Sequence, residues 1–104
     1  MLNNFVIVGR ITKIESEKTE NGASKTIVTL AVPRSFKNNE GIYETDFIDC
    51  TLLNNVAVNT VEYCKKGDLI AIKGRVQNLN NTAQLQIIGE KISFLSSRKA
   101  EDGE

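Results

Sequence analysis

Short apolar runs separated by polar turns recur along the chain, and most of them have the composition of β-strands. Residues 5–14, 25–32 and 43–53 are rich in β-branched and other apolar side chains. The pair Asn21-Gly22 lies between the first two runs, and this dipeptide is a strong short-range signal for a β-hairpin. The pattern therefore predicts three strands in the first half of the chain, with the first two joined as a hairpin.

A helical pattern then interrupts the strands. Apolar residues at helical spacing predict one short helix over about residues 55–66, which begins at a pair of asparagines and ends before Gly67. Strand patterns return over residues 68–77 and 83–95, each with an internal glycine. This order predicts an all-β fold, a five-stranded OB-fold Greek-key barrel with one short helix between strands 3 and 4. A half-open five-stranded sheet with the helix plugging one end is the main alternative.

Length and composition agree with a single domain. The 104 residues are 40% hydrophobic and 25% charged, which is typical of a globular domain. We expect the barrel to occupy residues 1–96 and a flexible, polar and acidic tail to occupy residues 97–104. No apolar run approaches the length of a transmembrane helix, and no leader pattern follows Met1. The chain is therefore expected to be a soluble protein of the cytoplasm without membrane contact.

The residue types that most enzymes need are scarce. The chain has 0 histidines, which removes the commonest general base and metal ligand. Cys50 and Cys64 lie in apolar segments and match no zinc motif, so we expect two small buried hydrophobes in a reducing compartment. Asp46 and Asp49 are the closest aspartates, and their offset in a strand puts them on opposite faces. We therefore expect a binding protein with no catalytic residue, cofactor or metal; a metal-dependent nuclease is the least favoured alternative.

The distribution of charge is more informative than its total. The formal net charge is zero, from 13 Lys and Arg and 13 Asp and Glu. Three of these acids, Glu101, Asp102 and Glu104, close the chain, so the residues before them carry a surplus of +3. The body of the chain is thus mildly basic, which is compatible with an anionic partner such as a nucleic acid.

Several segments match a known pattern in order and spacing. They are residues 1–3, 8–12 (VGRIT), 29–32 (TLAV) continuing to Phe36 and Lys37, 45–48 (TDFI), 65–69 (KKGDL) and 73–77 (KGRVQ). Over about residues 1–95 the chain thereby resembles the bacterial single-stranded DNA-binding protein family. The resemblance implies an OB-fold, a homotetramer built as a dimer of dimers, and sequence-independent binding of single-stranded DNA in replication, recombination and repair. The expected partners are single-stranded DNA, further copies of this chain, and replication or repair proteins.

The resemblance and the chemistry of the ligand together select candidate contact residues. A binder of unpaired DNA needs aromatic rings that stack on bases and cations that follow the phosphates. Phe36 and Phe47 match the stacking aromatics of the family by position, and Tyr43 is a third candidate. Phe36 favours stacking because it lies among charged residues of a predicted loop, whereas Phe47 could equally fill the core and Tyr43 could shield a turn. The expected phosphate contacts are Arg10, Arg34, Lys37, Lys73 and Arg75.

The other lysines and aromatics of these segments have structural explanations. Lys65 and Lys66 suit the negative end of the predicted helix dipole, so helix stabilisation is their expected role. Phe5, Tyr63 and Phe94 are expected in the core or at a subunit interface.

The chain also departs from the family pattern. It has 0 tryptophans, Leu53 stands where a further aromatic is expected, and the turn over residues 78–82 is short and has no basic or aromatic residue. We therefore expect weaker binding or a smaller binding site than in a fuller relative. The acidic, phenylalanine-ended tip through which the family recruits proteins has no counterpart in residues 101–104, as in a short form of the family or a piece of a longer chain. The alternative function is an OB-fold protein-interaction module of the replication machinery that binds DNA weakly.

Overall fold

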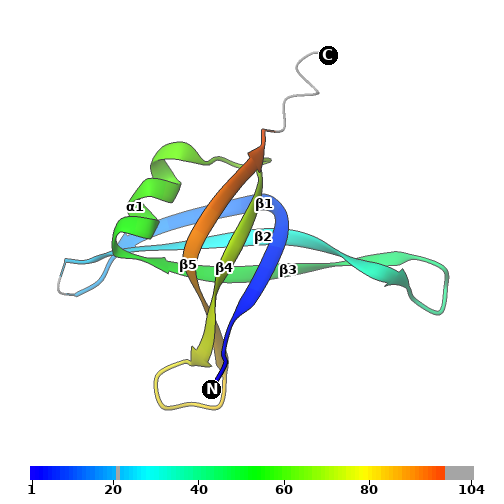
Figure 1. Ribbon diagram of the computed structural model, residues 1–104, viewed down its shortest axis with the longest axis horizontal. Coiled ribbons are helices and arrows are strands. Elements are labelled where there is room, and N and C mark those ends of the chain that lie inside the picture. The colour runs from blue at the N-terminus through cyan, green and yellow to red at the C-terminus, as the bar shows by residue number, and fades with distance from the viewer. Residues whose placement is uncertain (21, 98–104) are drawn as a thin grey trace.

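The computed structural model describes residues 1–20 and 22–97 of the chain. Its elements, in order, are β1 (Phe5–Lys18), β2 (Ser24–Lys37), β3 (Tyr43–Leu53), α1 (Asn54–Tyr63), β4 (Leu69–Asn78) and β5 (Leu85–Ser96). The strands form a closed barrel in the order β1-β2-β3-β5-β4 (Figure 1). The predicted five-stranded OB-fold barrel with one helix between strands 3 and 4 is confirmed, and the half-open sheet is wrong. Of the predicted tail over residues 97–104, all but Ser97 lies outside the described residues.

The inner faces of the strands meet in one aliphatic core. Its buried members are Ile11, Val28, Leu30, Cys50, Leu52, Ala57, Ile70 and Ile72. Side chains alternate between the two faces of a strand, so burial of Leu30 and Cys50 places Ala31 and Phe47 on the outside. The sequence pattern left open which face of residues 43–53 points inward. In the structure, the face with Cys50 and Leu52 is buried in the core.

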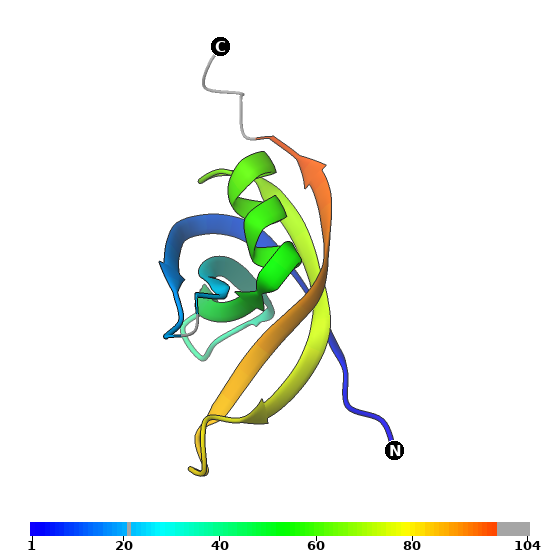
Figure 2. The ribbon, with the colours of Figure 1, turned by 90° about the vertical axis from the view of Figure 1, so that its left-hand side faces the viewer.

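Helix α1 lies at one end of the barrel, as Figures 1 and 2 show. Ala57 and Thr60 are its buried residues, and the helix packs mainly against β2. The hydroxyl of Thr60 donates to the carbonyl of Val56 at 2.8 Å, so this polar side chain is satisfied within the helix. The N-cap is Leu53 instead of an asparagine.

The helix ends earlier than the sequence pattern predicts. Its last residue is Tyr63, so Lys65 and Lys66 lie beyond it and do not stabilise its last turn. Gly67, with φ of 93°, belongs to a separate turn closed by a hydrogen bond from the Asp68 N–H to the Lys65 carbonyl at 3.1 Å. The side chain of Asp68 accepts the Lys65 N–H in the same turn, at 2.9 Å. A side chain-stabilised turn therefore replaces the expected helix C-cap.

Strands β2 and β3 continue past the barrel as a two-stranded projection over residues 33–45, which we call the arm (Figure 1, right). The sequence predicted a strand end at Pro33 and a loop after it, and this is wrong. β1 pairs with β2 only as far as Ala31, so β2 has a free edge from there on. A residue without an N–H is tolerated at such an edge, and Pro33 pairs with Thr45 within the arm.

Closure of the barrel depends on close contact between backbones of β4 and β5 at Gly74. A Cβ atom built on this glycine would overlap the carbonyl oxygen of Ile88. We expect Gly74→Ala to lower the free energy of unfolding by about 3 kcal/mol, the cost of forcing an extra carbon into a packed site.

The control is Gly41→Ala in the turn of the arm, where φ is 79° and the space is open. Its expected cost is about 1–2 kcal/mol of backbone strain. Urea denaturation measures the free energy of unfolding of both variants. Equal decreases in the two would contradict the close packing at Gly74.

Candidate nucleic-acid interface

Three neighbouring strands present their outward residues as one surface, which we call the outer face. Pairing of β1 with β2 and of β2 with β3 arranges this face in rows of three residues. The rows are Arg10–Ala31–Phe47, Lys13–Thr29–Asp49, Glu15–Ile27–Thr51 and Glu17–Lys25–Leu53, and Thr51 is the one buried member. Because β2 and β3 extend into the arm, the arm continues this surface beyond the barrel.

The first row brings together two of the predicted contact residues. Phe47 is 66% exposed, and its cross-strand neighbour Ala31 is too small to cover the ring. Arg10 lies on the other side of Ala31, and its Nη1 donates to the carbonyl of Gly67 at 3.0 Å. That carbonyl orients the guanidinium but carries no formal charge, and no acid among residues 1–20 and 22–97 forms an ion pair with Arg10. An exposed ring and an oriented cation thus lie in the same row, on either side of β2.

Hollows of the surface lie on both sides of Phe47 along the strands. One, of about 510 Å³, lies where β1 bends, between Arg10 and Thr12 on one wall and Pro33 and Thr45 on the other. The second, of about 440 Å³, lies between β2, β3 and the turn from β4 to β5. Its lining is Lys25, Ile27, Asp49, Thr51, Leu79, Gln84, Leu85, Gln86 and Ile87. A flat aromatic flanked by two open hollows is a surface on which a flexible chain of bases can lie.

The arm carries the other two predicted aromatics. Phe36 is 64% exposed and Tyr43 is 56% exposed. The Nζ of Lys37 lies 5.8 Å from the centroid of the Tyr43 ring, within the range of a cation–π contact. The sequence placed Phe36 in a loop, whereas it lies near the end of β2. All three predicted stacking residues are therefore outside the core.

Arg34 is engaged by carboxylates on the opposite strand of the arm. Its Nε and Nη2 donate to both oxygens of Asp46, at 3.1 and 2.9 Å, and its Nη1 donates to Glu44 at 2.8 Å. The hydrogen bond from Arg34 holds the pKa of Asp46 below its ordinary value near 3.8. The same hydrogen bond raises the pKa of the Arg34 guanidinium. Arg34 is thus paired with two carboxylates in the protein without ligand.

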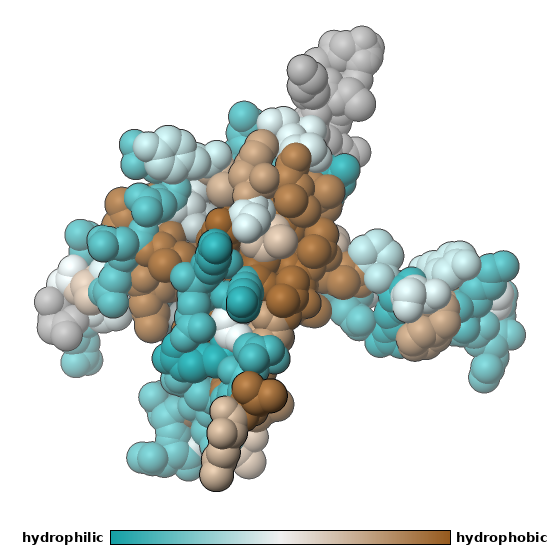
Figure 3. Space-filling model, viewed as in Figure 1, coloured by the Kyte–Doolittle hydropathy of each residue, from teal (hydrophilic) through white to brown (hydrophobic). Residues whose placement is uncertain are grey.

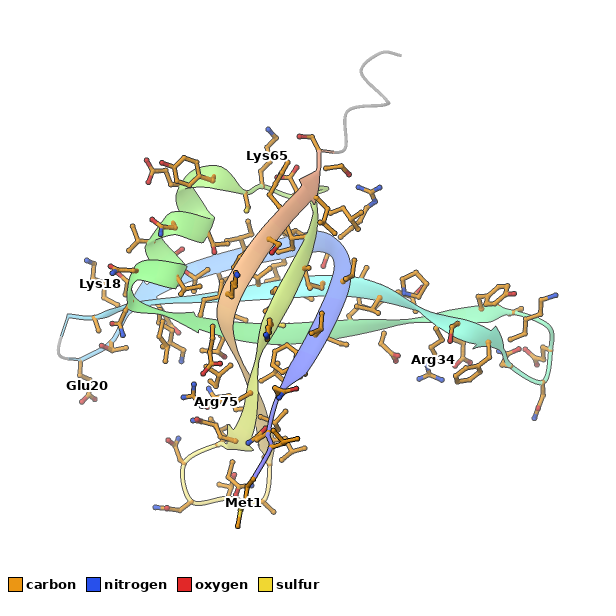
Figure 4. All side chains as sticks on the ribbon, viewed as in Figure 1. Met1, Lys18, Glu20, Arg34, Lys65 and Arg75 are labelled. Atoms are coloured by element: carbon orange, nitrogen blue, oxygen red, sulfur yellow. The ribbon has the colours of Figure 1, made fainter. Side chains whose placement is uncertain are left out.

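Lys73 and Arg75, the remaining predicted phosphate contacts, lie on β4 and not on the outer face. Lys73 is paired with Val6 of β1 and Lys91 of β5. Arg75 forms an ion pair with Glu90 and lines a hollow beside the start of α1. Figure 4 shows Arg34 on the arm and Arg75 well away from it. The structure therefore does not bring the predicted cations together in one patch.

Sequence reasoning missed several polar residues that line the outer face. Lys13 and Lys25 lie on it, and both are ion-paired, with Glu15 at 3.2 Å and with Glu17 at 3.5 Å. Gln86 approaches from β5, and its Nε2 lies 3.5 Å from the hydroxyl of Thr51. Alternation around the buried residues of β2 could have found Lys25, but only the fold shows that Gln86 lies over β3.

The surface carries hydrogen-bonding and stacking groups but no activated nucleophile among its described residues. Burial, with a smaller contribution from Asp49, raises the pKa of Cys50 to about 11. Burial also raises the pKa of Cys64, which is half-buried. Among residues 1–20 and 22–97, no group of three or more potential metal ligands lies together, and no helix is long and apolar enough to cross a membrane.

Comparison with known proteins gives consistent matches over nearly the whole chain. "Single-stranded DNA-binding protein B" of Bacillus subtilis is 37% identical over 109 residues, which cover 97% of this chain and 96% of that protein. "Single-stranded DNA-binding protein 1" of Streptococcus pyogenes is 39% identical and is covered over 82% of its length. A Bacillus cereus single-stranded DNA-binding protein is 37% identical, and this chain spans 62% of its length.

A solved structure supports the same fold. A deletion mutant of the single-stranded DNA-binding protein from Thermus aquaticus superposes with a TM-score of 0.72 at 22% identity. The match covers 94% of this chain and 52% of the Thermus chain. The sequence profile described as the single-strand binding protein family matches residues 2–95, which include every strand but the last residue of β5. The chain therefore belongs to the single-strand binding protein family.

Proposed function

We propose that this protein binds single-stranded DNA irrespective of sequence and protects it during replication, recombination and repair. The observation that carries the proposal is the exposure of Phe47 on the outer face, in one row with Arg10 and between two hollows. Family membership and the names of the relatives support the same ligand. Such a protein works where the DNA is, in the bacterial cytoplasm at the nucleoid.

Base stacking explains why sequence would not matter. Every base has a π-face, so Phe47, Phe36 and Tyr43 can each accept any base, at about 1–3 kcal/mol per stacked base. Lys37 lies over the Tyr43 ring and Arg10 shares a row with Phe47, and these two are the proposed phosphate contacts of this surface. Lys73 and Arg75 lie further round the barrel, where they would meet a strand that continues past the outer face. The DNA path thus runs from the arm across Phe47 toward the β4–β5 turn.

Fluorescence titration of labelled oligothymidine at several salt concentrations tests the proposal. The association constant K should fall as the salt concentration rises. A plot of log K against log salt concentration should have a slope of about −0.7 for each phosphate that the protein neutralises. Absent or salt-independent binding would count against DNA binding. If the protein bound no oligothymidine but retained a replication protein in a pull-down, the result would favour the alternative function, a protein-interaction module.

Removal of the Phe47 ring should weaken binding without unfolding the protein. Loss of one stacked base, about 1–3 kcal/mol, corresponds to roughly a 5- to 140-fold loss of affinity for Phe47→Ala. Because the ring is 66% exposed, the melting temperature should change little. Tyr63→Ala is the control, since this ring is 73% exposed on α1 and away from the outer face. Equal oligothymidine affinities of the two variants would show that Phe47 does not contact the DNA.

We also propose that the protein assembles as a homotetramer, a dimer of dimers. Apolar side chains gather over β1, β4 and β5 (Figure 3), and Val6, Val8, Phe94 and Leu95 are 45–65% exposed. Residues 5–9 of β1 pair with β4 but not with β2, so this half of β1 has a free edge. An apolar face beside a free strand edge suits pairing with a second copy of the chain.

Charges placed on this face should break the assembly. Burying an uncompensated carboxylate costs several kcal/mol, and Val8 pairs with the uncharged Ala71 of β4, so Val8→Glu should dissociate the tetramer into smaller species. Val58→Glu is the matched control, because Val58 is 49% exposed on α1, outside the apolar face. Sedimentation velocity measures the mass of each. An unchanged mass of Val8→Glu, or a monomeric parent protein, would contradict the proposed interface.

A further inference from the structure

The arm has to hold its shape without a hydrophobic core. Beyond Ala31 it is covered by no other strand, and Phe36, Ile42 and Tyr43 are all more than half exposed. Its backbone ladder is also interrupted, because the register of β2 on β3 shifts between Pro33 and Lys37. A two-stranded ribbon of this kind is marginally stable at best in water. Some other interaction is needed to keep the arm ordered.

A chain of side-chain hydrogen bonds crosses the arm where the backbone ladder fails. Arg34 lies within the irregular segment of β2 and binds Asp46 and Glu44 of β3 through three hydrogen bonds of 2.8–3.1 Å. The second oxygen of Glu44 accepts from the Nδ2 of Asn38 at 3.1 Å. The Oδ1 of Asn38 then accepts the backbone N–H groups of Glu40 and Ile42, at 2.8 and 3.0 Å. The network therefore runs from the base of the arm to its turn.

The electrostatics of this network argue against a phosphate ligand for Arg34. One guanidinium faces two carboxylates, so the group carries a net charge of −1 and would repel a phosphate. Three of the five N–H donors of the guanidinium are directed at carboxylate oxygens. A bidentate arginine–carboxylate pair has a fixed planar geometry, which a lysine cannot reproduce. Arg34 thus has the properties of a cross-strand connection.

We propose that Arg34 is a positioning residue: with Asp46 and Glu44 it braces the arm, so that Phe36 and Tyr43 meet the DNA in an ordered geometry. This inference rests on the proposed binding of single-stranded DNA. It replaces the expectation that Arg34 contacts a phosphate. The two roles differ in what a lysine can do, because a lysine can contact a phosphate but cannot form this brace.

The salt dependence of oligothymidine binding separates the two roles. Without the brace, binding has to order the arm, so Arg34→Lys and Arg34→Ala should both weaken affinity about 2- to 12-fold, the cost of one ordered side chain. The slope of log K against log salt should stay at the parent value, whereas Lys37→Ala should flatten it by about 0.7. Parent-like affinity of Arg34→Lys, or a slope flattened by about 0.7 in Arg34→Ala, would overturn the inference.

A carboxylate variant tests the brace from the opposite strand. Removing a negative charge from the arm reduces its repulsion of DNA, whichever residue is changed. Asp46→Asn is therefore compared with Glu40→Gln, which removes an equal charge in the turn of the arm. Glu40 contributes its backbone N–H to the network but not its carboxylate. Binding of Asp46→Asn should be weaker than that of Glu40→Gln. Tighter binding would mean that freeing Arg34 creates a phosphate contact, and the brace would be wrong.

Acid titration provides a measure of the brace that involves no DNA. The pKa of Asp46 is depressed by Arg34, so the ion pair stabilises the arm fully above the ordinary value near 3.8 and the contribution is lost as the pH falls through the folded pKa. The facing charged groups are Arg34 and Glu44. The carboxyl carbon resonance of Asp46 should titrate below 3.8 in the parent protein and move back toward 3.8 in Arg34→Ala. An unchanged midpoint would contradict the ion pair.

Hydrogen–deuterium exchange separates failure of the brace from failure of DNA binding. In Arg34→Lys, amides over residues 33–45 should exchange faster while those of β1 and β4 keep their protection. Arg75→Lys is the matched control, because it alters another ion-paired arginine, which lies outside the arm. Unchanged exchange in the arm of Arg34→Lys overturns the brace whether or not DNA binds. Faster exchange with no oligothymidine binding by the parent protein keeps the brace and refutes the proposed function.

Discussion

Burial of one face of β2 and β3 is the constraint on which the rest of the structure depends. Val28 and Leu30 enter the core from β2, and Cys50 and Leu52 enter it from β3. With a side-chain period of two, a slip of one residue would exchange the faces of a strand and put Phe47 inside. The aliphatic core thus determines the outer face, although it touches no ligand. The exposed ring, the rows of polar residues and the hollows all follow from that register.

The arm shows what happens where this constraint ends. Inside the barrel, backbone ladders on both sides and apolar burial keep β2 in place. Past Ala31 the ladder with β1 ends, the ladder with β3 is interrupted between Pro33 and Lys37, and a polar network from Asp46 to the turn at Asn38 takes over. Exposed ion pairs contribute little singly, but several that share partners and cross an interrupted ladder can act as a unit. The protein uses charge for local order where hydrophobic packing is not available.

Much of the fold could be predicted from the sequence because burial leaves a pattern. β3 covers residues 43–53 as expected, because the strand pattern ends there at a pair of asparagines, although both faces of this segment are mixed. The ends of β1 and β2 could not be predicted in the same way. Residues 15–18 are polar and form a strand because they pair across the first hairpin. Residues 34–37 have one apolar member, Phe36, so hydropathy indicates a strand in neither segment. Likewise, the exposure of Phe47 was open until the inward face was known.

The candidate site shows the same limit more clearly. Candidate cations could be chosen from the sequence as residue types, but their partners depend on register. Asp46 lies 12 residues from Arg34 along the chain and reaches it only because β3 folds back on β2. Arg75 is likewise compensated, by Glu90 on β5. A list of basic residues therefore overestimates the positive charge that a phosphate chain would meet.

This compensation has a consequence for how affinity is divided between stacking and charge. On the outer face and the arm, the described residues pair Lys13 with Glu15, Lys25 with Glu17, and Arg34 with two acids. Arg10 and Lys37, by contrast, contact a carbonyl oxygen and a ring face, and neither of these cancels a charge. Few phosphates can then release counterions, so stacking on the exposed rings has to supply a larger share of the binding free energy. A protein of zero net charge can bind a polyanion on these terms, because unpaired bases offer an apolar surface that duplex DNA keeps hidden.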